Sequence, residues 1–378
     1  MNDLYHPLQS LRQGSWFKLI CGASFQHLPA VRDLVLAYTL AGVDCIDVAS
    51  DPAVVLAAKT GIEVASELLP ETHGPIGQSR GMPLLMVSVN DGEDPHFRKA
   101  EFDPAVCPAD CPRPCEMICP AQAIVFDQSS PSGGFSGVLS DRCYGCGRCL
   151  PVCPIRQITT RAHGTSPAAV AALVMQMGVD AIEIHTQVGR LEAFRQLWAE
   201  ISPSLNHLKL VAISCPDDEG LIEYLWALYN VVSPLPCSLV WQTDGRPMSG
   251  DIGTGATRAA IRLGQKVLAA KLPGYVQLAG GTNHHTVPKL RSLNLLNTRT
   301  ADSPRRYIAG VAYGSYARTL LQPVLNQLEA RSKRLEMAPD LLEQAVELAT
   351  SLVSQLKPGL VLPEPLTEFP PAITPMKI

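Results

Sequence analysis

The run CYGCGRCLPVCP occupies residues 143–154 and has the spacing CxxCxxCxxxCP. In bacterial ferredoxins this spacing lets three cysteines ligate one 4Fe-4S cluster while the fourth ligates a second cluster. Gly145 and Gly147 allow the backbone to turn tightly and to approach the cluster sulfides. The run therefore predicts a ferredoxin-like module.

A second cysteine group precedes this run. Residues 107–120 read CPADCPRPCEMICP, a CxxxCxxxCxxxCP variant with wider gaps that keeps the final Cys-Pro. The two groups together predict two 4Fe-4S clusters. One cluster is assigned to Cys119, Cys143, Cys146 and Cys149, and the other to Cys107, Cys111, Cys115 and Cys153. The alternative is a pair of four-cysteine zinc sites, but those lack the third cysteine and the trailing Cys-Pro in each half.

Outside the cysteine block, short apolar runs alternate with amphipathic stretches, a pattern typical of βα units around a parallel sheet. Eight runs are expected to be strands: residues 17–22, 44–49, 84–89, 157–161, 180–185, 208–214, 238–242 and 275–279. Eight strands with crossover helices predict an α/β fold of the (β/α)8-barrel type, with the cysteine block inserted between the third and fourth strands. A doubly wound open sheet is the alternative.

This pattern divides the chain into five parts. Residues 15–100 and 161–300 form the two parts of the barrel, and residues 101–160 form the ferredoxin-like 4Fe-4S insertion. Residues 301–357 are expected to be C-terminal helices, mainly at 307–330 and 339–356, and a further helix is expected at 168–177. The proline-rich tail at 358–378 favours extended chain.

Two glycine-rich stretches follow the last two predicted strands. Gly253 and Gly255 precede a predicted helix, and Gly280 and Gly281 follow the eighth predicted strand. In barrels, a phosphate commonly rests on backbone amides in this region, so these loops are candidates for a phosphate or for FMN. Tight turns explain the glycines equally well. No catalytic triad is recognisable.

Composition excludes several classes of function. The chain has 378 residues and a formal net charge of -4, without the basic balance that binding to the phosphate backbone of a nucleic acid requires. No charged start followed by an apolar run indicates a secretory signal, and no stretch reaches the roughly 20 apolar residues of a membrane span. We therefore expect a soluble cytoplasmic protein, in which clustered cysteines indicate metal or redox chemistry.

The chain also resembles a known family. The resemblance is carried by FKLICGAS near the start, the two cysteine runs, and an α/β body with QLAGGTN near residue 280, and it spans nearly the whole chain. These features are similar to those of the light-dependent period family of cyanobacterial iron-sulfur proteins. The resemblance implies a protein that senses the redox state set by photosynthetic electron flow and passes it to the circadian clock through proteins such as CikA and KaiA.

Two functions remain open on these grounds. In the first, the protein is a sensor whose clusters receive electrons from a ferredoxin or a quinone, and a partner reads their oxidation state. In the second, it is an oxidoreductase whose clusters pass electrons to a flavin or small substrate at the barrel mouth. We favour the sensor over the catalyst, because only glycine loops and scattered histidines indicate a substrate site.

Overall fold

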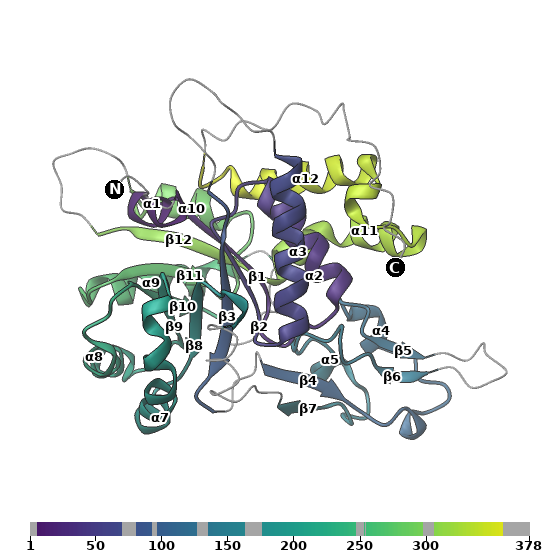
Figure 1. Ribbon diagram of the computed structural model, residues 1–378. Helices are drawn as coiled ribbons and strands as arrows, with labels where there is room; N and C mark the ends of the chain where they lie inside the picture. The colour runs from purple at the N-terminus through teal and green to yellow at the C-terminus, as the bar shows by residue number, and fades with distance from the viewer. Residues whose placement is uncertain are drawn as a thin grey trace.

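The computed structural model contains a closed barrel of eight parallel strands surrounded by helices (Figure 1). It describes residues 6–69, 81–92, 97–126, 135–162, 176–246, 253, 255–297 and 306–357. The barrel strands are β1 (Trp16–Gly22), β2 (Cys45–Ala49), β3 (Leu84–Asn90), β8 (Ala181–His185), β9 (Leu210–Pro216), β10 (Ser238–Asp244), β11 (Tyr275–Ala279) and β12 (Ile308–Tyr313). They follow one another around the ring in chain order, and β12 pairs with β1 to close it. The predicted barrel is confirmed, and the open sheet is wrong.

Helices cover the outside of the barrel and one of its ends. Those that follow strands are α2 (Leu28–Leu40), α3 (Pro52–Leu68), α7 (Leu191–Ile201), α8 (Leu221–Val232), α9 (Thr257–Ala269), α10 (Thr286–Ser292) and α11 (Ser315–Arg331). Short 3-10 turns lie at Ser202–His207 and Leu335–Met337, and α12 (Pro339–Val353) packs against α11 and α2. Local sequence explains the helix starts: the Asp51 carboxylate accepts hydrogen bonds from the backbone N–H groups of Ala53 and Val54, and Pro52 follows in the first turn.

One of the eight predicted barrel strands is wrong, and the strand that closes the barrel was not predicted. Residues 157–161 were expected to form a barrel strand, but β7 (Thr159–Ala162) pairs antiparallel with β4 (Arg98–Glu101) inside the insertion. The eighth barrel strand is β12, within residues 307–330, where a continuous helix was expected. A short buried strand of small and apolar residues cannot be distinguished from a helix by periodicity. The expected helix at 168–177, apart from its last two residues, and the tail at 358–378 lie outside the described residues.

The inside of the barrel changes from apolar to polar along its axis. Helix α1 (His6–Gln13) packs against β1 and β12, and its Leu11 lies among inward-facing apolar side chains. That layer contains Trp16, Cys45, Leu84, Met86, Ala181, Leu210, Ala212, Val240 and Ala309. Nearer the C-terminal ends of the strands, buried polar side chains replace them. The buried polar side chains therefore gather toward the C-terminal mouth of the barrel.

The cysteine-rich insertion leaves the barrel after β3 and returns before β8. It contains two antiparallel strand pairs, β4 with β7 and β5 (Ile124–Phe126) with β6 (Ser136–Val138). It also contains a 3-10 turn at Pro104–Val106 and the short helices α4 (Pro114–Ile118) and α5 (Cys149–Val152). Cys115 and Cys149 lie in the two helices, and Cys107, Cys119 and Cys153 directly follow the three elements. A small core of its own joins Cys115, Ile124, Cys149, Cys153 and Ile158. In Figure 1 the insertion lies at the lower right, below α2 and α3.

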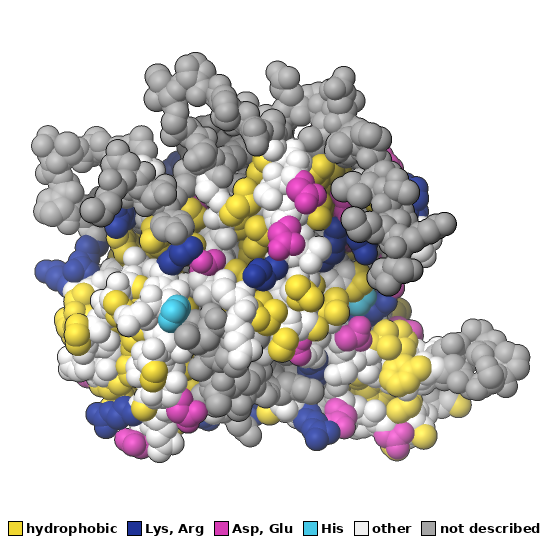
Figure 2. Space-filling model, in the orientation of Figure 1, with side chains coloured by type: hydrophobic (Ala, Val, Ile, Leu, Met, Phe, Trp, Pro, Cys, Tyr) yellow, Lys and Arg dark blue, Asp and Glu magenta, His cyan; other side chains and the backbone are white. Residues whose placement is uncertain are grey.

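Among the described residues, no helix is both long and apolar enough to cross a bilayer. On the face shown in Figure 2, basic and acidic side chains are interspersed and do not gather into a basic surface.

Candidate functional site

Four cysteines of the insertion line one cavity. They are Cys119, Cys143, Cys146 and Cys149. This is the set that the sequence assigns to one cluster: three thiols from the tight run and one from the upstream group. Gly145 and Gly147 have φ values of 70° and 72°, which allow the loop between the thiols to turn back on itself.

Backbone amides surround the sulfurs of this cavity. The N–H of Ala100 donates to Cys143 Sγ at 3.3 Å, and the N–H of Ala123 donates to Cys119 Sγ at 3.2 Å. Burial, together with the neighbouring sulfurs of Cys146, Cys143 and Cys119, raises the pKa of the Cys149 thiol to about 12. Four thiols crowded in this way release their protons only when a strongly cationic centre compensates the charge. The donor set therefore fits an iron-sulfur cluster.

The other four cysteines lie close together around α4 and the end of α5. Burial raises the pKa of the Cys107 thiol, and its neighbours Cys111 and Cys153 raise it further. Cys115 is influenced in the same way by Cys153 and Cys107. The amide of Gln157 donates to Cys107 Sγ at 2.8 Å. These contacts bring the second predicted ligand set together.

Cys153 differs from the other cysteines that the sequence predicts to be ligands. Burial opposes its ionisation, but the backbone N–H groups of residues 155–158 donate to it and lower the pKa of its thiol. Hydrogen bonds from several N–H groups favour the thiolate form of a cysteine, and in iron-sulfur proteins such bonds to sulfur influence the reduction potential of the cluster. The two cysteine sets thus differ in environment. In the described part of the chain, no three Cys, His, Asp or Glu side chains are placed to hold a single metal ion.

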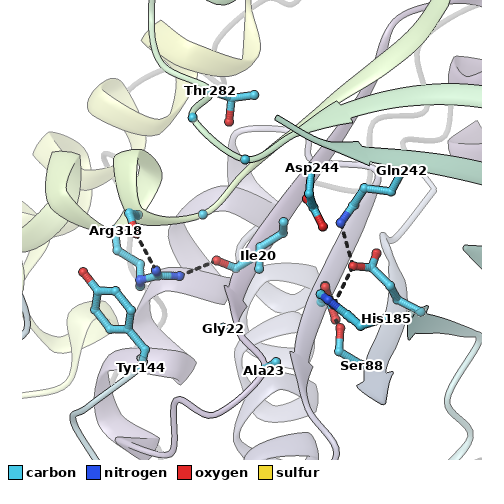
Figure 3. A pocket seen from close by; sticks show the side chains of 16 residues that line it. Ile20, Gly22, Ala23, Ser88, Tyr144, His185, Gln242, Asp244, Thr282 and Arg318 are labelled. Atoms are coloured by element: carbon cyan, nitrogen blue, oxygen red, sulfur yellow. Dashed lines mark hydrogen bonds and ion pairs between the residues drawn. The ribbon is translucent and has the colours of Figure 1, made fainter. Parts of the chain in front are cut away.

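A second cavity lies at the C-terminal mouth of the barrel. It is lined by Ile20, Gly22, Ala23, Asp47, Ser88, Tyr144, Glu183, His185, Gln242, Asp244, Gly280, Gly281, Thr282, Gly314, Ser315 and Arg318. Figure 3 shows Arg318 and Tyr144 on one side of this space and His185, Gln242 and Asp244 on the other. All these residues except Tyr144 belong to the barrel, whereas Tyr144 comes from the insertion.

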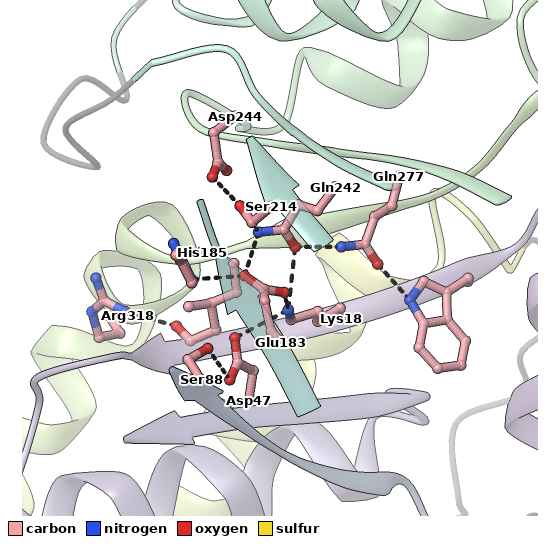
Figure 4. Close-up of polar contacts among 12 residues, drawn as sticks. Lys18, Asp47, Ser88, Glu183, His185, Ser214, Gln242, Asp244, Gln277 and Arg318 are labelled. Carbon is pink, nitrogen blue, oxygen red and sulfur yellow. Dashed lines mark hydrogen bonds and ion pairs between the residues drawn. The ribbon is translucent and has the colours of Figure 1, made fainter. Parts of the chain in front are cut away.

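A buried polar network forms the floor of this cavity (Figure 4). Lys18 forms ion pairs with Glu183 and, at 3.0 Å, with Asp47, and it donates to Gln242 Oε1 at 3.2 Å. His185 Nε2 lies 2.9 Å from Glu183 Oε1. These side chains are almost inaccessible to water, so each charge depends on its partners.

Electrostatic interactions determine the charge states of Lys18 and Glu183. Burial opposes both charges, but the attraction of Asp47 and Glu183 raises the pKa of Lys18 above its ordinary value. Burial likewise opposes ionisation of Glu183, yet Lys18 and His185 lower its pKa to about 2. Burial raises the pKa of Asp47, and the nearby charge of Glu183 adds to this rise. The floor therefore holds a charged Lys18–Glu183 pair.

Two further layers of hydrogen bonds connect this pair to the surrounding strands. Gln242 donates from Nε2 to Glu183 Oε1 at 2.6 Å and receives a hydrogen bond from Gln277 at 2.6 Å. Ser88 Oγ donates to Asp47 at 2.7 Å, and Ser214 Oγ donates to Asp244. The network therefore extends across β1, β2, β3, β8, β9, β10 and β11.

Tyr144 joins the two cavities. Its position between Cys143 and Gly145 puts it in the wall of the cysteine cavity, and its side chain also lines the barrel mouth. The guanidinium carbon of Arg318 lies 3.9 Å from the centre of the Tyr144 ring, and Phe25 packs edge-on against the same ring at 5.9 Å. The insertion thus covers part of the barrel mouth with one of its predicted ligand loops.

The predicted glycine loops are only partly at this site. Gly280 and Gly281 line the barrel mouth, with φ values of 65° and 93°, but they follow the seventh strand, β11, and not the eighth. Gly253 and Gly255 follow the sixth strand, β10, and are not among the lining residues. Gly314, at the end of β12, occupies the place after the eighth strand. The strand numbers differ by one because residues 157–161 were counted as a barrel strand.

Sequence reasoning missed most of the barrel floor. Lys18, Asp47 and Glu183 each stand inside an otherwise apolar strand, in FKLICG, CIDVA and AIEIH. A charged residue at an inward position of a buried strand is uncommon unless it is paired, so these interruptions were the available signal. Arg318 gave no signal, because it lies in an amphipathic helix 298 residues from its partner Ile20.

Comparisons with known proteins agree with this site. Residues 107–164 match the family model described as the LdpA Fe-S cluster-binding domain, and residues 173–355 match the light dependent period A C-terminal domain. Light dependent period A of Synechococcus elongatus is 50% identical over 351 residues, which cover 93% of this chain and 94% of that protein.

Two solved structures are similar to the chain at a lower level. One is (S)-3-O-geranylgeranylglyceryl phosphate synthase from Thermoplasma acidophilum, with a TM-score of 0.38, 13% identity, and 95% of this chain and 99% of that chain covered. The other is tryptophan synthase subunit alpha from Legionella pneumophila, with a TM-score of 0.41, 10% identity, and 94% and 100% covered. The match to the relative from Synechococcus is of a different order, and through it and the matching iron-sulfur domain this chain belongs to the light dependent period A family.

Proposed function

We propose that this protein is a cytoplasmic redox sensor that binds two 4Fe-4S clusters and relays the light-dependent redox state of the cell to the circadian clock. A 4Fe-4S cluster supplies reversible storage of one electron. The observation that carries the proposal is Tyr144, which lines both the cysteine cavity and the barrel mouth. A change of charge beside Cys143 and Cys146 therefore lies next to a side chain that packs on the barrel.

The residues around the cysteine cavity can stabilise one charge state of a cluster and can respond when that charge changes. The amides of Ala100 and Ala123 donate to ligand sulfurs, and these bonds strengthen when the sulfurs become more negative. Arg318 is attracted to the same charge through the ring of Tyr144. The insertion is also tied to the barrel by the Arg142–Glu329 ion pair and by Lys99, which donates to Gln26 at 2.6 Å.

The cluster content is tested by metal analysis of protein purified without oxygen. Two cubanes require about eight iron and about eight acid-labile sulfide per chain. Zinc and flavin are measured on the same sample, because stoichiometric zinc without sulfide would support the zinc sites instead. Cys237→Ser is the matched control, since Cys237 lies on the barrel outside both ligand sets and its loss should leave the iron content unchanged.

The assignment of ligands is tested by electron paramagnetic resonance. Cys119→Ser should perturb the cluster of Cys143, Cys146 and Cys149, whereas Cys153→Ser should perturb the cluster of Cys107, Cys111 and Cys115. We expect two different spectral changes. Identical losses in the two variants would contradict the exchange of ligands between the two sequence groups.

The partners follow from the family resemblance. We propose clock-input proteins such as CikA and KaiA as the readers, and a ferredoxin or a quinone as the electron source. Capture of each reader by oxidised and by dithionite-reduced protein tests the relay. A tenfold preference for one state requires a differential binding free energy of about 1.4 kcal/mol, and equal capture would leave the sensor without support.

The second candidate is an oxidoreductase, and the buried Lys18–Glu183–His185 group at the barrel mouth favours it. Such charged groups in a cavity are candidates for proton transfer. Reduction of the clusters by NADPH, with and without added FMN, separates the two functions. We expect slow or no reduction, and rapid catalytic reduction would favour the enzyme.

A further inference from the structure

The barrel mouth contains a buried cation whose described partners are all uncharged. Arg318 is 4% exposed and donates to the carbonyl oxygens of Ile20 at 2.7 Å and Cys21 at 2.8 Å and to the hydroxyl of Ser315 at 3.1 Å. Its Nε is buried without a hydrogen-bond partner. Burying a guanidinium in this way is costly unless an anion compensates it. The side chain lines the cavity, so the anion can come from there.

The surroundings of Arg318 supply backbone groups that favour an anion. Gly280 and Gly281 after β11 and Gly314 and Ser315 after β12 line the same cavity. Ser315 begins α11, a helix of 17 residues, whose first N–H groups have no partner within the helix. In barrels, the loops after the seventh and eighth strands and a helix N-terminus commonly hold a phosphate.

The two glycines after β11 cannot be replaced without displacing backbone. A Cβ on Gly280 would lie 2.8 Å from the backbone of Arg246, and a Cβ on Gly281 would lie 2.9 Å from the carbonyl oxygen of Ala256. Their positive φ values add a second constraint. Tight packing against this backbone therefore requires glycine at both positions, and both residues line the cavity without a side chain.

The opposite wall is polar, and its carboxylates have described partners. Asp244, which also lines the cavity, accepts a hydrogen bond from Ser214. Glu183 is paired with Lys18 and His185, and Asp47 is bonded to Ser88 and paired with Lys18. Lys18 thus has carboxylate partners, whereas none of the described hydrogen-bond partners of Arg318 is a carboxylate. These two walls suit a ligand that is anionic at one end and polar but uncharged at the other. Its anionic group would lie at Arg318, and its hydroxyl or carbonyl groups would face Gln242 and His185.

We propose that the barrel mouth binds a phosphorylated small molecule, with its phosphate at Arg318, Gly280–Gly281 and the start of α11, and that reduction of the adjacent cluster weakens this binding. Arg318 faces the cavity on one side and the Tyr144 ring, next to Cys143 and Cys146, on the other. A ligand phosphate and an electron added to the cluster at those cysteines are both negative, and both are attracted to Arg318. The added electron therefore disfavours the bound phosphate. By linkage, a ligand that prefers the oxidised form lowers the reduction potential of that cluster.

Binding is tested with inorganic phosphate as the probe. The whole cluster-containing protein is titrated calorimetrically with phosphate and, at equal ionic strength, with chloride. We expect saturable binding of phosphate and none of chloride. Arg318→Gln should weaken the affinity for phosphate by about tenfold or more, because a charge-assisted hydrogen-bond donor is lost. Lys266→Gln is the matched control, since it removes an exposed charge from the Lys266–Asp217 pair on α9 and should not change the affinity.

Ser315→Asp provides a second test that does not remove Arg318. Ser315 Oγ lies 3.1 Å from Arg318, so the new carboxylate should occupy the anion position and abolish phosphate binding while iron content stays at the wild-type level. The site is overturned if wild-type protein shows no saturable binding of phosphate, or if both variants bind it as wild type does.

The redox dependence rests on the proposed function and is measured separately. In a redox titration followed by electron paramagnetic resonance, phosphate should lower the potential of the cluster assigned to Cys119, Cys143, Cys146 and Cys149 and leave the other unchanged. Tenfold weaker binding on reduction corresponds to about 59 mV for one electron. Binding without a shift would overturn the linkage and leave the site intact. Loss of redox-dependent partner capture would overturn the sensor, but it would not affect the calorimetric result.

Discussion

At the scale of single residues, the barrel mouth is organised around Lys18. The side chain is fully buried, yet two carboxylates and an amide oxygen surround its ammonium group. Such a group contributes little net stability compared with an apolar core, because desolvation offsets most of the attraction. Stability alone therefore does not explain why a buried ion pair lies at the floor of this cavity.

The Lys18→Met variant should lose about 3–5 kcal/mol of unfolding free energy, because Glu183 and Asp47 would be left as buried carboxyl groups without their cation. Urea denaturation followed by circular dichroism measures the change. Lys266→Met is the matched control: its exposed pair with Asp217 should contribute less than about 1 kcal/mol. A loss of similar size in both variants would contradict this role of Lys18.

At the scale of elements, β12 closes the barrel and brings α11 to the mouth. Gly310 of β12 pairs with Trp16 of β1, and a Cβ at Gly310 would lie 2.3 Å from the carbonyl oxygen of Trp16. Only glycine permits this close approach of the two strands. Because α11 starts directly after β12, the same closure places Ser315 and Arg318 over the cavity.

Gly310→Ala distinguishes the strand from the helix that sequence alone suggested. In the barrel, the added methyl overpacks the β1–β12 pair and should destabilise the protein by about 1–3 kcal/mol. In a helix at 307–330, the same change would stabilise by up to about 1 kcal/mol. Urea denaturation decides the sign. As a control, Gly220→Ala should be nearly neutral, because Gly220 has a φ of -84° and its Cβ would meet nothing closer than 3.4 Å.

At the scale of the whole molecule, the insertion and the barrel depend on different interactions. The barrel has an extensive apolar core between its strands and helices. The insertion has a small core in which three of the five buried residues are predicted ligands, Cys115, Cys149 and Cys153. Small modules of this kind commonly obtain their folding free energy from bound metal.

Removal of iron by a chelator under reducing conditions should therefore unfold the insertion and leave the barrel folded. Limited proteolysis with mass spectrometry should find new cleavage sites within residues 101–160, while the far-ultraviolet signal of the barrel helices is largely retained. Reconstitution with iron and sulfide should restore protection. Unchanged protection in the iron-free protein would show that the insertion folds without its clusters.

The sequence by itself determined the barrel class and seven of its eight strands, because these depend on local signals. Apolar runs mark buried strands, and cysteines three or four positions apart are the local pattern that predicts the clusters. It did not determine which strand closes the barrel, because the short apolar run IAGVAY of β12 has no periodicity that distinguishes a buried strand from a helix.

Only the tertiary structure brought together the barrel mouth. Lys18 and Glu183 are 165 residues apart, and Arg318 meets Ile20 across 298 residues. No local pattern encodes such pairs. Lys18 on β1 and Glu183 on β8 meet across the interior of the closed barrel, and Arg318 on α11 reaches Ile20 because β12, which precedes α11, pairs with β1. The same closure placed Arg318 against Tyr144 of the insertion, a contact that connects the predicted cluster site to the barrel cavity.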